Sequence, residues 1–130
     1  MEKTNFENLE IYQLSEKLAD EIWQIVLGWN GLAQDTVGKQ IIRSADSISA
    51  NIAEGSGRGS NQDYKRFLKI SRGSPYETRH WLRRAFKRKL LMDEQIKSIT
   101  PTLEKLTTKL NAYIRSIGTY DNKNVADKKE

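Results

Sequence analysis

Residues 40–77 read QIIRSADSISANIAEGSGRGSNQDYKRFLKISRGSPYE, and this stretch decides the fold. Its first part predicts a helix, because apolar residues recur along one helical face: Ile41, Ala45, Ile48 and Ile52. Gly55 follows them, where a left-handed helix cap favours a residue without Cβ. Ser60 then opens a second helix, with Asp63 three residues on as an approximate capping box. One short glycine-rich turn therefore joins two amphipathic helices, which we expect to lie antiparallel.

Two further helical patterns flank this pair. Residues 8–29 are apolar on two neighbouring faces, so this helix is either deeply buried or presents a surplus face, including Trp23 or Trp29, to another subunit. The stretch from Gly28 to Gly38 is the expected link to the next helix. The last helix follows a plausible N-cap at Asp93 and carries a heptad seam: Ile96, Ile99, Leu103, Leu106, Leu110, Tyr113 and Ile117. We therefore predict an all-α, antiparallel up-and-down four-helix bundle with a left-handed twist.

The domain boundary is expected at the end of the fourth helix. Residues 1–118 should form the bundle, with Gly118 ending the helix, and residues 119–130, TYDNKNVADKKE, should be a disordered polar tail. Pro75 and Pro101 fall inside two helical patterns, where proline bends or divides a helix. The sequence leaves the continuity of both helices open.

Composition indicates where the protein works. The chain of 130 residues has no cysteine, which fits a reducing compartment. It has no apolar run approaching the roughly 20 residues of a membrane span, and its start lacks the apolar core of a signal peptide. We expect a cytoplasmic protein with no membrane partner.

The third helix carries the functional signal. Residues 65–89 contain ten cations and one carboxylate, a formal charge of +9, whereas the rest of the chain must carry −4 to give the total of +5. At 100° per residue, six of these cations fall within a stripe of roughly 80° around Tyr76. The residues predicted to bind nucleic acid are Lys65, Lys69, Arg72, Tyr76, Arg79, Arg83, Arg84, Lys87 and Arg88.

Two alternatives to nucleic-acid binding remain open. A charged helix face is often only solvated, although such faces usually mix signs and this one does not. The same cations could instead dock an acidic partner protein, which would make the chain a structural interaction module.

Nothing in the sequence assembles a catalytic or cofactor site. His80 is the only histidine, and with no cysteine a zinc ligand set cannot form. The loop of residues 55–60 follows a helix and lacks the Gly-Lys-Ser/Thr ending of a phosphate loop. We therefore expect no enzyme activity, no catalytic residues, no metal, no cofactor and no small-molecule substrate. The polar and glycine residues around the turn are interpreted as structural: Asn51, Glu54, Gly55, Gly57, Arg58 and Ser60.

The string NIAEGSGR at residues 51–58, followed by Ser60, residues 66–68, Gly73-Ser74 and Glu77, resembles the core signature of a bacterial four-helix-bundle family. The genes of this family were first noticed in intervening sequences within 23S ribosomal RNA genes. Residues 6–12, FENLEIY, look like the start of that family, and residues 42–45 like its second helix. The resemblance covers about residues 6–117.

The resemblance implies an assembly and partners. Members of the family look like ring-forming homopentamers, and relatives act as accessory variability proteins of diversity-generating retroelements, where a basic ring is associated with a reverse transcriptase and its RNA. We therefore expect a homopentameric scaffold that binds RNA or DNA through its basic face, with a reverse transcriptase or another acidic protein as a further partner.

Overall fold

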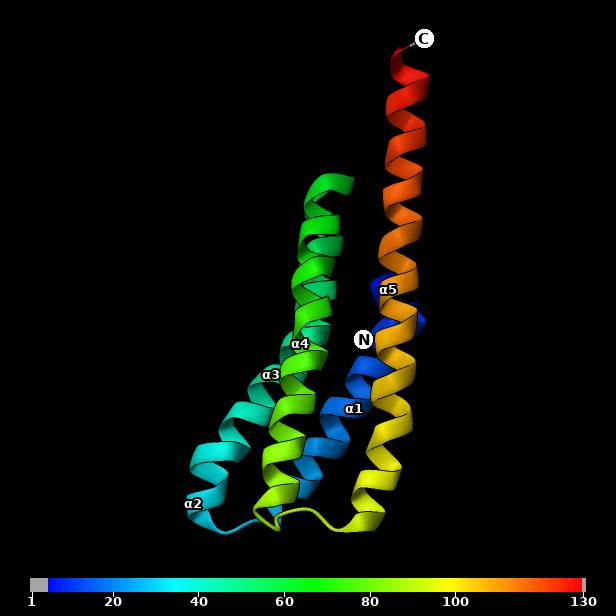
Figure 1. Cartoon of the computed structure of the whole chain (residues 1–130). Coiled ribbons are helices and arrows are strands. Elements are labelled where there is room, and N and C mark those ends of the chain that lie inside the picture. Colours follow the sequence, from blue (N-terminus) through cyan, green and yellow to red (C-terminus); the bar gives the residue numbers. More distant parts are fainter. Residues whose placement is uncertain (1–4, 130) are drawn as a thin grey trace.

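Four long helices lie side by side in the computed structural model, which describes the backbone of residues 5–129 and the side chains of residues 5–117 (Figure 1). The long helices are α1 (Glu10–Leu27), α3 (Lys39–Ser56), α4 (Asn61–Lys87) and α5 (Asp93–Lys129). Short helical turns complete the chain: η1 (Phe6–Asn8), α2 (Gly31–Ala33) and the π-helical η2 (Gln34–Gly38). Residues 5–129 contain no strand, so the prediction of an all-α four-helix bundle is confirmed.

The long helices form a closed circuit of neighbours. α1 contacts α3, α3 contacts α4, α4 contacts α5, and α5 returns to α1. Consecutive long helices run in opposite directions along the bundle (Figure 1). α1 and α4 therefore lie at opposite corners. The handedness of the twist stays a prediction.

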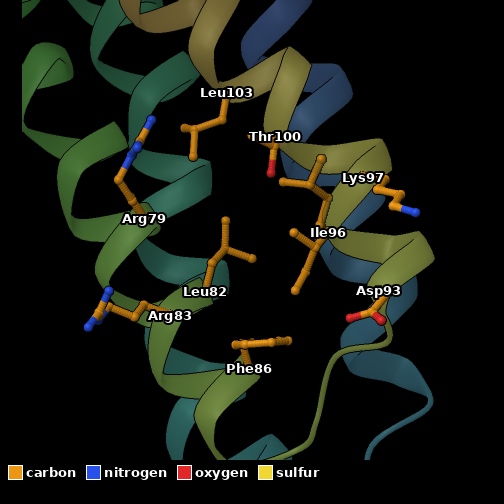
Figure 2. A pocket seen from close by; sticks show the side chains of 10 residues that line it. Arg79, Leu82, Arg83, Phe86, Asp93, Ile96, Lys97, Thr100 and Leu103 are labelled. Carbon is orange, nitrogen blue, oxygen red and sulfur yellow. The ribbon is translucent and has the colours of Figure 1, made fainter.

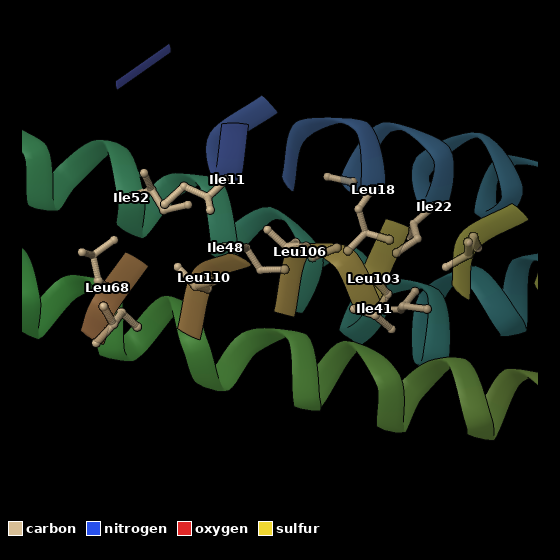
Figure 3. Packing of buried hydrophobic residues seen from close by; sticks show 14 of the residues in the cluster. Ile11, Leu18, Ile22, Ile41, Ile48, Ile52, Leu68, Leu103, Leu106 and Leu110 are labelled. Carbon is tan, nitrogen blue, oxygen red and sulfur yellow. The ribbon is translucent and has the colours of Figure 1, made fainter. Parts of the chain in front are cut away.

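The core is built from the faces that helical periodicity predicts. Figure 3 shows isoleucines and leucines of α1, α3 and α5 meeting inside the bundle, with Leu68 contributed by α4. In α5 the central heptad positions are buried, and Tyr113 and Ile117 pack against the core from its edge. The fully buried large side chains include Leu18, Ile22, Ile41, Ile48, Ile52, Leu68, Ile99, Leu106 and Leu110.

The contact between α3 and α4 is made by small, hydrogen-bonded side chains. The Ser71 hydroxyl donates to the Ile48 carbonyl at 3.0 Å, and the Thr78 hydroxyl donates to the Ser44 hydroxyl at 3.0 Å. Each of these buried hydroxyls thus has a partner, which avoids the cost of an unsatisfied polar group. Small side chains on both helices let their backbones approach closely.

Gly55 takes part in this close approach, and its predicted role as a left-handed cap is wrong. α3 continues through Gly55 to Ser56 and ends at Gly57, whose φ is −87°. The positive φ of the turn falls on Gly59, at 82°. Gly55 is buried, and a Cβ on it would lie 2.7 Å from the Cβ of Phe67 on α4. Glycine is needed here for space between helices and not for backbone conformation.

The predicted start of α4 is confirmed, whereas the start of α5 and the link after α1 differ from the prediction. The Ser60 hydroxyl accepts a hydrogen bond from the Asp63 amide at 3.2 Å, as an N-cap should. The cap of α5 is Met92 and not Asp93, because the Met92 amide donates to the Gln95 side chain at 2.9 Å. The link after α1 is only Gly28–Asn30, since α2 and η2 lead directly into α3.

Neither internal proline divides its helix. α4 is continuous through the buried Pro75, and α5 is continuous through Pro101. Gly118 does not end α5 either, because the helix continues to Lys129. Among the described side chains of α5, which end at Ile117, the last buried one is Ile114. The division into a domain of residues 1–118 and a tail stays a prediction, and the side chains of the tail lie outside the described residues.

Two tyrosines tie α4 to α5 near the glycine-rich turn. The Tyr64 and Tyr113 hydroxyls are 3.0 Å apart, and their rings meet edge to face with centroids 6.1 Å apart. Burial raises the pKa of the Tyr64 hydroxyl, and its hydrogen bond with Tyr113 raises the pKa further. Deprotonation of Tyr64 is therefore disfavoured in the folded state.

Gly55→Val should destabilise the protein by about 1–3 kcal/mol, the usual cost of forcing extra atoms into a packed interface. The reason is the contact between the added side chain and Phe67. Gly57→Ala is the matched control, because its φ is ordinary and the nearest atom to its Cβ is 3.6 Å away. Urea unfolding should show little change for the control. Equal losses in both variants would contradict the close-approach account.

Tyr64 should make stability fall in alkaline solution. An unfolded tyrosine loses its proton near pH 10, whereas the folded protein holds that proton to higher pH. The folded state then binds more protons, so the free energy of unfolding should drop by up to about 1.4 kcal/mol per pH unit above pH 10. Tyr64→Phe should remove this part of the slope, and Tyr76→Phe, at an exposed position, should keep it. Identical slopes in all three proteins would refute the prediction.

Candidate nucleic-acid interface

The predicted basic residues lie on the surface of α4, except Arg88, which directly follows the helix. Lys65 and Arg84 are half-buried. The other members of the predicted set are exposed: Lys69, Arg72, Tyr76, Arg79, Arg83, Lys87 and Arg88. Because α4 is continuous through Pro75, the cations from Lys65 to Lys87 share one rigid helix about 33 Å long.

Six of these cations follow one face of α4, and we call them the basic row: Lys65, Lys69, Arg72, Arg79, Arg83 and Lys87. At 100° per residue they stay within about 80° of arc, while Arg84 and Arg88 fall on the neighbouring face. The buried face of α4, which includes Leu68 and Ser71, points into the bundle. The structure therefore brings the row together and separates Arg84 and Arg88 from it.

The basic row lacks intramolecular counter-ions. The ion pairs between described side chains are Arg58–Glu54, Arg66–Asp63, Lys105–Glu10 and Lys109–Glu10, and none involves the row. Cations that are not neutralised within the chain keep their attraction for an external anion. This distinguishes α4 from α5, where Lys105 and Lys109 both pair with Glu10 of α1.

Tyr76 sits in the middle of the row. Its side chain is 59% exposed, so the ring is open to solvent between Arg72 and Arg79. An exposed ring among cations can stack on an unpaired base while the cations bind the adjoining phosphates.

A groove between α4 and α5 borders the lower half of the row. Its volume is about 380 Å³, and Figure 2 shows Arg79 and Arg83 along one side and Lys97 on the other. Leu82, Phe86, Ile96, Ile99 and Leu103 make its apolar surface, with Asp93 and Thr100 at its α5 side. Sequence reasoning missed this groove, because its existence depends on the spacing of two helices and no residue pattern encodes that spacing.

The turn residues form a structural clasp. Arg58 donates to the Glu54 carboxylate at 2.8 Å, and its guanidinium lies over the Phe67 ring at 4.9 Å from the centroid. The Asn51 side chain donates to the Ser47 carbonyl one turn earlier in α3. The contacts of Arg58 and Gly55 with Phe67 thus connect the end of α3 to the start of α4, whereas the Asn51 bond lies within α3.

His80 does not gather with other reactive groups. Its ring is exposed and packs edge to face on Trp81, with centroids 4.8 Å apart. Within the described part of the chain, no three side chains of the metal-binding types His, Cys, Asp and Glu come together. A search of the described helices for a segment long and apolar enough to cross a membrane finds none.

Comparison with known proteins identifies the family of this chain. The sequence profile described as 23S rRNA-intervening sequence protein matches residues 7–112. No curated protein matches the chain. Among solved structures, a protein of unknown function from the S23 ribosomal protein family of Bacteroides thetaiotaomicron is 26% identical with a TM-score of 0.70, over 80% of this chain and 97% of that one. The chain therefore belongs to the 23S rRNA-intervening sequence protein family.

Proposed function

We propose that this protein is a non-enzymatic, self-associating helical scaffold that binds RNA or DNA through the basic row of α4. The observation that carries the proposal is the row itself: six cations on one continuous helix, without an intramolecular ion pair to any described side chain. The row is about as long as one turn of a nucleic-acid duplex. Phosphates along such a row would release condensed counter-ions, which is the main source of affinity in non-specific binding.

Self-association strengthens the same argument. The family resemblance implies a homopentamer, and a ring of copies would gather several basic rows into one field. Such a field attracts polyanions with little sequence preference, because phosphate contacts carry no base information. A role beside a reverse transcriptase rests on the resemblance alone.

The position of the cations in the basic row, and not only the net charge of the protein, should determine its affinity for nucleic acid. Lys65→Glu, Lys69→Glu and Arg72→Glu together should abolish most binding of RNA and DNA oligonucleotides at moderate salt, because three phosphate contacts are lost. For partial losses, the slope of log affinity against log salt should fall by about 0.7–0.9 per removed contact. Fluorescence anisotropy across a salt series measures both quantities.

The matched control changes the same total charge elsewhere. Lys17, Lys39 and Arg43 are exposed cations outside α4. Replacing these three with Glu lowers the net charge equally but should leave most of the binding. Equal losses of binding in the two triple variants would show that net charge alone, and not the basic row, determines the affinity. Absence of binding by the wild-type protein at about 50 mM salt would refute the proposal and leave an acidic protein as the candidate ligand of the row.

Tyr76→Ala tests base stacking separately from charge. Loss of the exposed ring should weaken binding of single-stranded oligonucleotides by about 1–3 kcal/mol and leave the salt slope nearly unchanged. Tyr76→Phe keeps the ring and should retain the affinity. Equal weakening by both variants would point to the hydroxyl and against stacking.

A further inference from the structure

α1 presents an outward stripe that combines acidic and apolar side chains. Glu16, Asp20, Trp23 and Leu27 are spaced four, three and four residues apart, so they share one helical face, and we call them the α1 stripe. Trp23 is 49% exposed and Leu27 is 55% exposed. Neither side chain belongs to the core clusters of the bundle. Exposed apolar side chains that lie together on one face make this stripe a candidate contact surface for another protein.

The carboxylates near this stripe lack cationic partners. Asp20 forms no ion pair with a described side chain. Burial raises the pKa of Asp46 on α3, and the nearby charge of Asp20 raises it further. Two carboxylates without an ion pair to a described side chain thus lie near each other, Asp20 on the α1 stripe and Asp46 on α3, where an external cation would lower the free energy.

The groove between α4 and α5 offers the complementary properties. Its surface is apolar at Leu82, Phe86 and Ile96, and cations stand on both of its sides, at Arg79, Arg83 and Lys97 (Figure 2). Phe86 is 45% exposed there, so the apolar surface is not covered within the chain. An acidic and apolar helix face therefore complements the apolar surface of this groove and its three cations, which outnumber the single carboxylate of its lining, Asp93.

The stripe and the groove lie at the same level of the bundle. The Ser98 hydroxyl of α5 donates to the Glu21 carboxylate of α1, which places these two residues side by side. Ile22 and Val26 of α1 also line one interior space with Leu82 and Ile99. Trp23 is therefore level with the middle of the groove, and the ends of α1 and α4 and the start of α5 lie at one end of the molecule (Figure 1).

We propose that the groove between α4 and α5 receives the α1 stripe of a second copy of this chain, with Trp23 and Leu27 on its apolar surface and Asp20 beside its cations. The contact joins two different surfaces, because α1 and α4 occupy opposite corners of the bundle. Such head-to-tail contacts generate rings when the rotation between copies closes and open filaments when it does not. The common level of stripe and groove favours a ring, because neighbouring copies then need no displacement along the bundle. The inference rests on the self-association included in the proposed function.

This contact uses only part of the basic row. Arg79 and Arg83 border the groove, whereas Lys65, Lys69 and Arg72 lie farther along α4 and do not line it. The upper part of the row thus stays open to nucleic acid in the assembly.

A mixing experiment tests the contact. Trp23→Glu damages the stripe and leaves the groove intact, whereas Phe86→Glu damages the groove and leaves the stripe intact. Each variant alone should sediment as a 15.0 kDa monomer at micromolar concentration. An equimolar mixture should form a heterodimer of twice that mass and nothing larger, because one intact stripe can enter one intact groove.

Ile70→Glu is the matched control, since Ile70 is an exposed α4 residue, 49% accessible, that does not line the groove. It should keep the wild-type assembly, and thermal unfolding should show that all three variants fold. Variants that assemble like the wild type, or a mixture that stays monomeric, would overturn the inference while leaving self-association by another surface intact. A monomeric wild-type protein would refute self-association itself, and with it this contact.

Discussion

The close approach of α3 and α4 is the constraint on which the rest of the structure depends. It requires the absence of a side chain at Gly55, where a Cβ would stand 2.7 Å from Phe67. It also requires hydroxyls that form hydrogen bonds between the helices. The Thr78 hydroxyl donates to the Ser44 hydroxyl, and the Ser71 hydroxyl donates to the Ile48 carbonyl. Because the buried residues of α4 are mostly small, α4 packs closely on α3. On its other side, a groove separates part of α4 from α5.

The packing of α4 on α3 also determines which side chains of α4 are exposed to solvent. Most of the buried residues of α4 are small, with Leu68 as the large exception, and most of its exposed long side chains are cations. On the side of the bundle where α1 meets α5, by contrast, Glu10 pairs with both Lys105 and Lys109. The bonds from Lys109 and Lys105 hold the pKa of the Glu10 carboxyl below its ordinary value. The basic row has no such internal partner among the described side chains, so its charges stay available to an anion from outside the chain.

Periodicity was sufficient to predict the bundle, because burial follows the helical repeat: Ile41, Ile48 and Ile52 are buried as their spacing predicts. The role of Gly55 could not be predicted in this way. A glycine after the last apolar residue of a helix fits both a cap and a close contact, and only Phe67 across the interface distinguishes them. The groove was missed for a related reason, since its volume depends on how far α5 stands from α4. That Tyr76 shares a helical stripe with the cations could be predicted, because it follows from the angle of each residue around one helix. The exposure of Tyr76 could not, because it depends on which face of α4 the bundle buries.

Assembly and nucleic-acid binding are linked through charge if both occur on this bundle. Each chain carries a net charge of +5, so copies that gather in a ring repel one another, and the repulsion weakens as salt screens it. The contact between Asp20 and the cations of the groove offsets part of this repulsion locally. A polyanion along Lys65, Lys69 and Arg72 offsets it across the ring. Linkage is reciprocal, so a nucleic acid that binds the ring more tightly than the monomer must also stabilise the ring. The same surface charge that opposes assembly of the free protein would then favour assembly on its ligand.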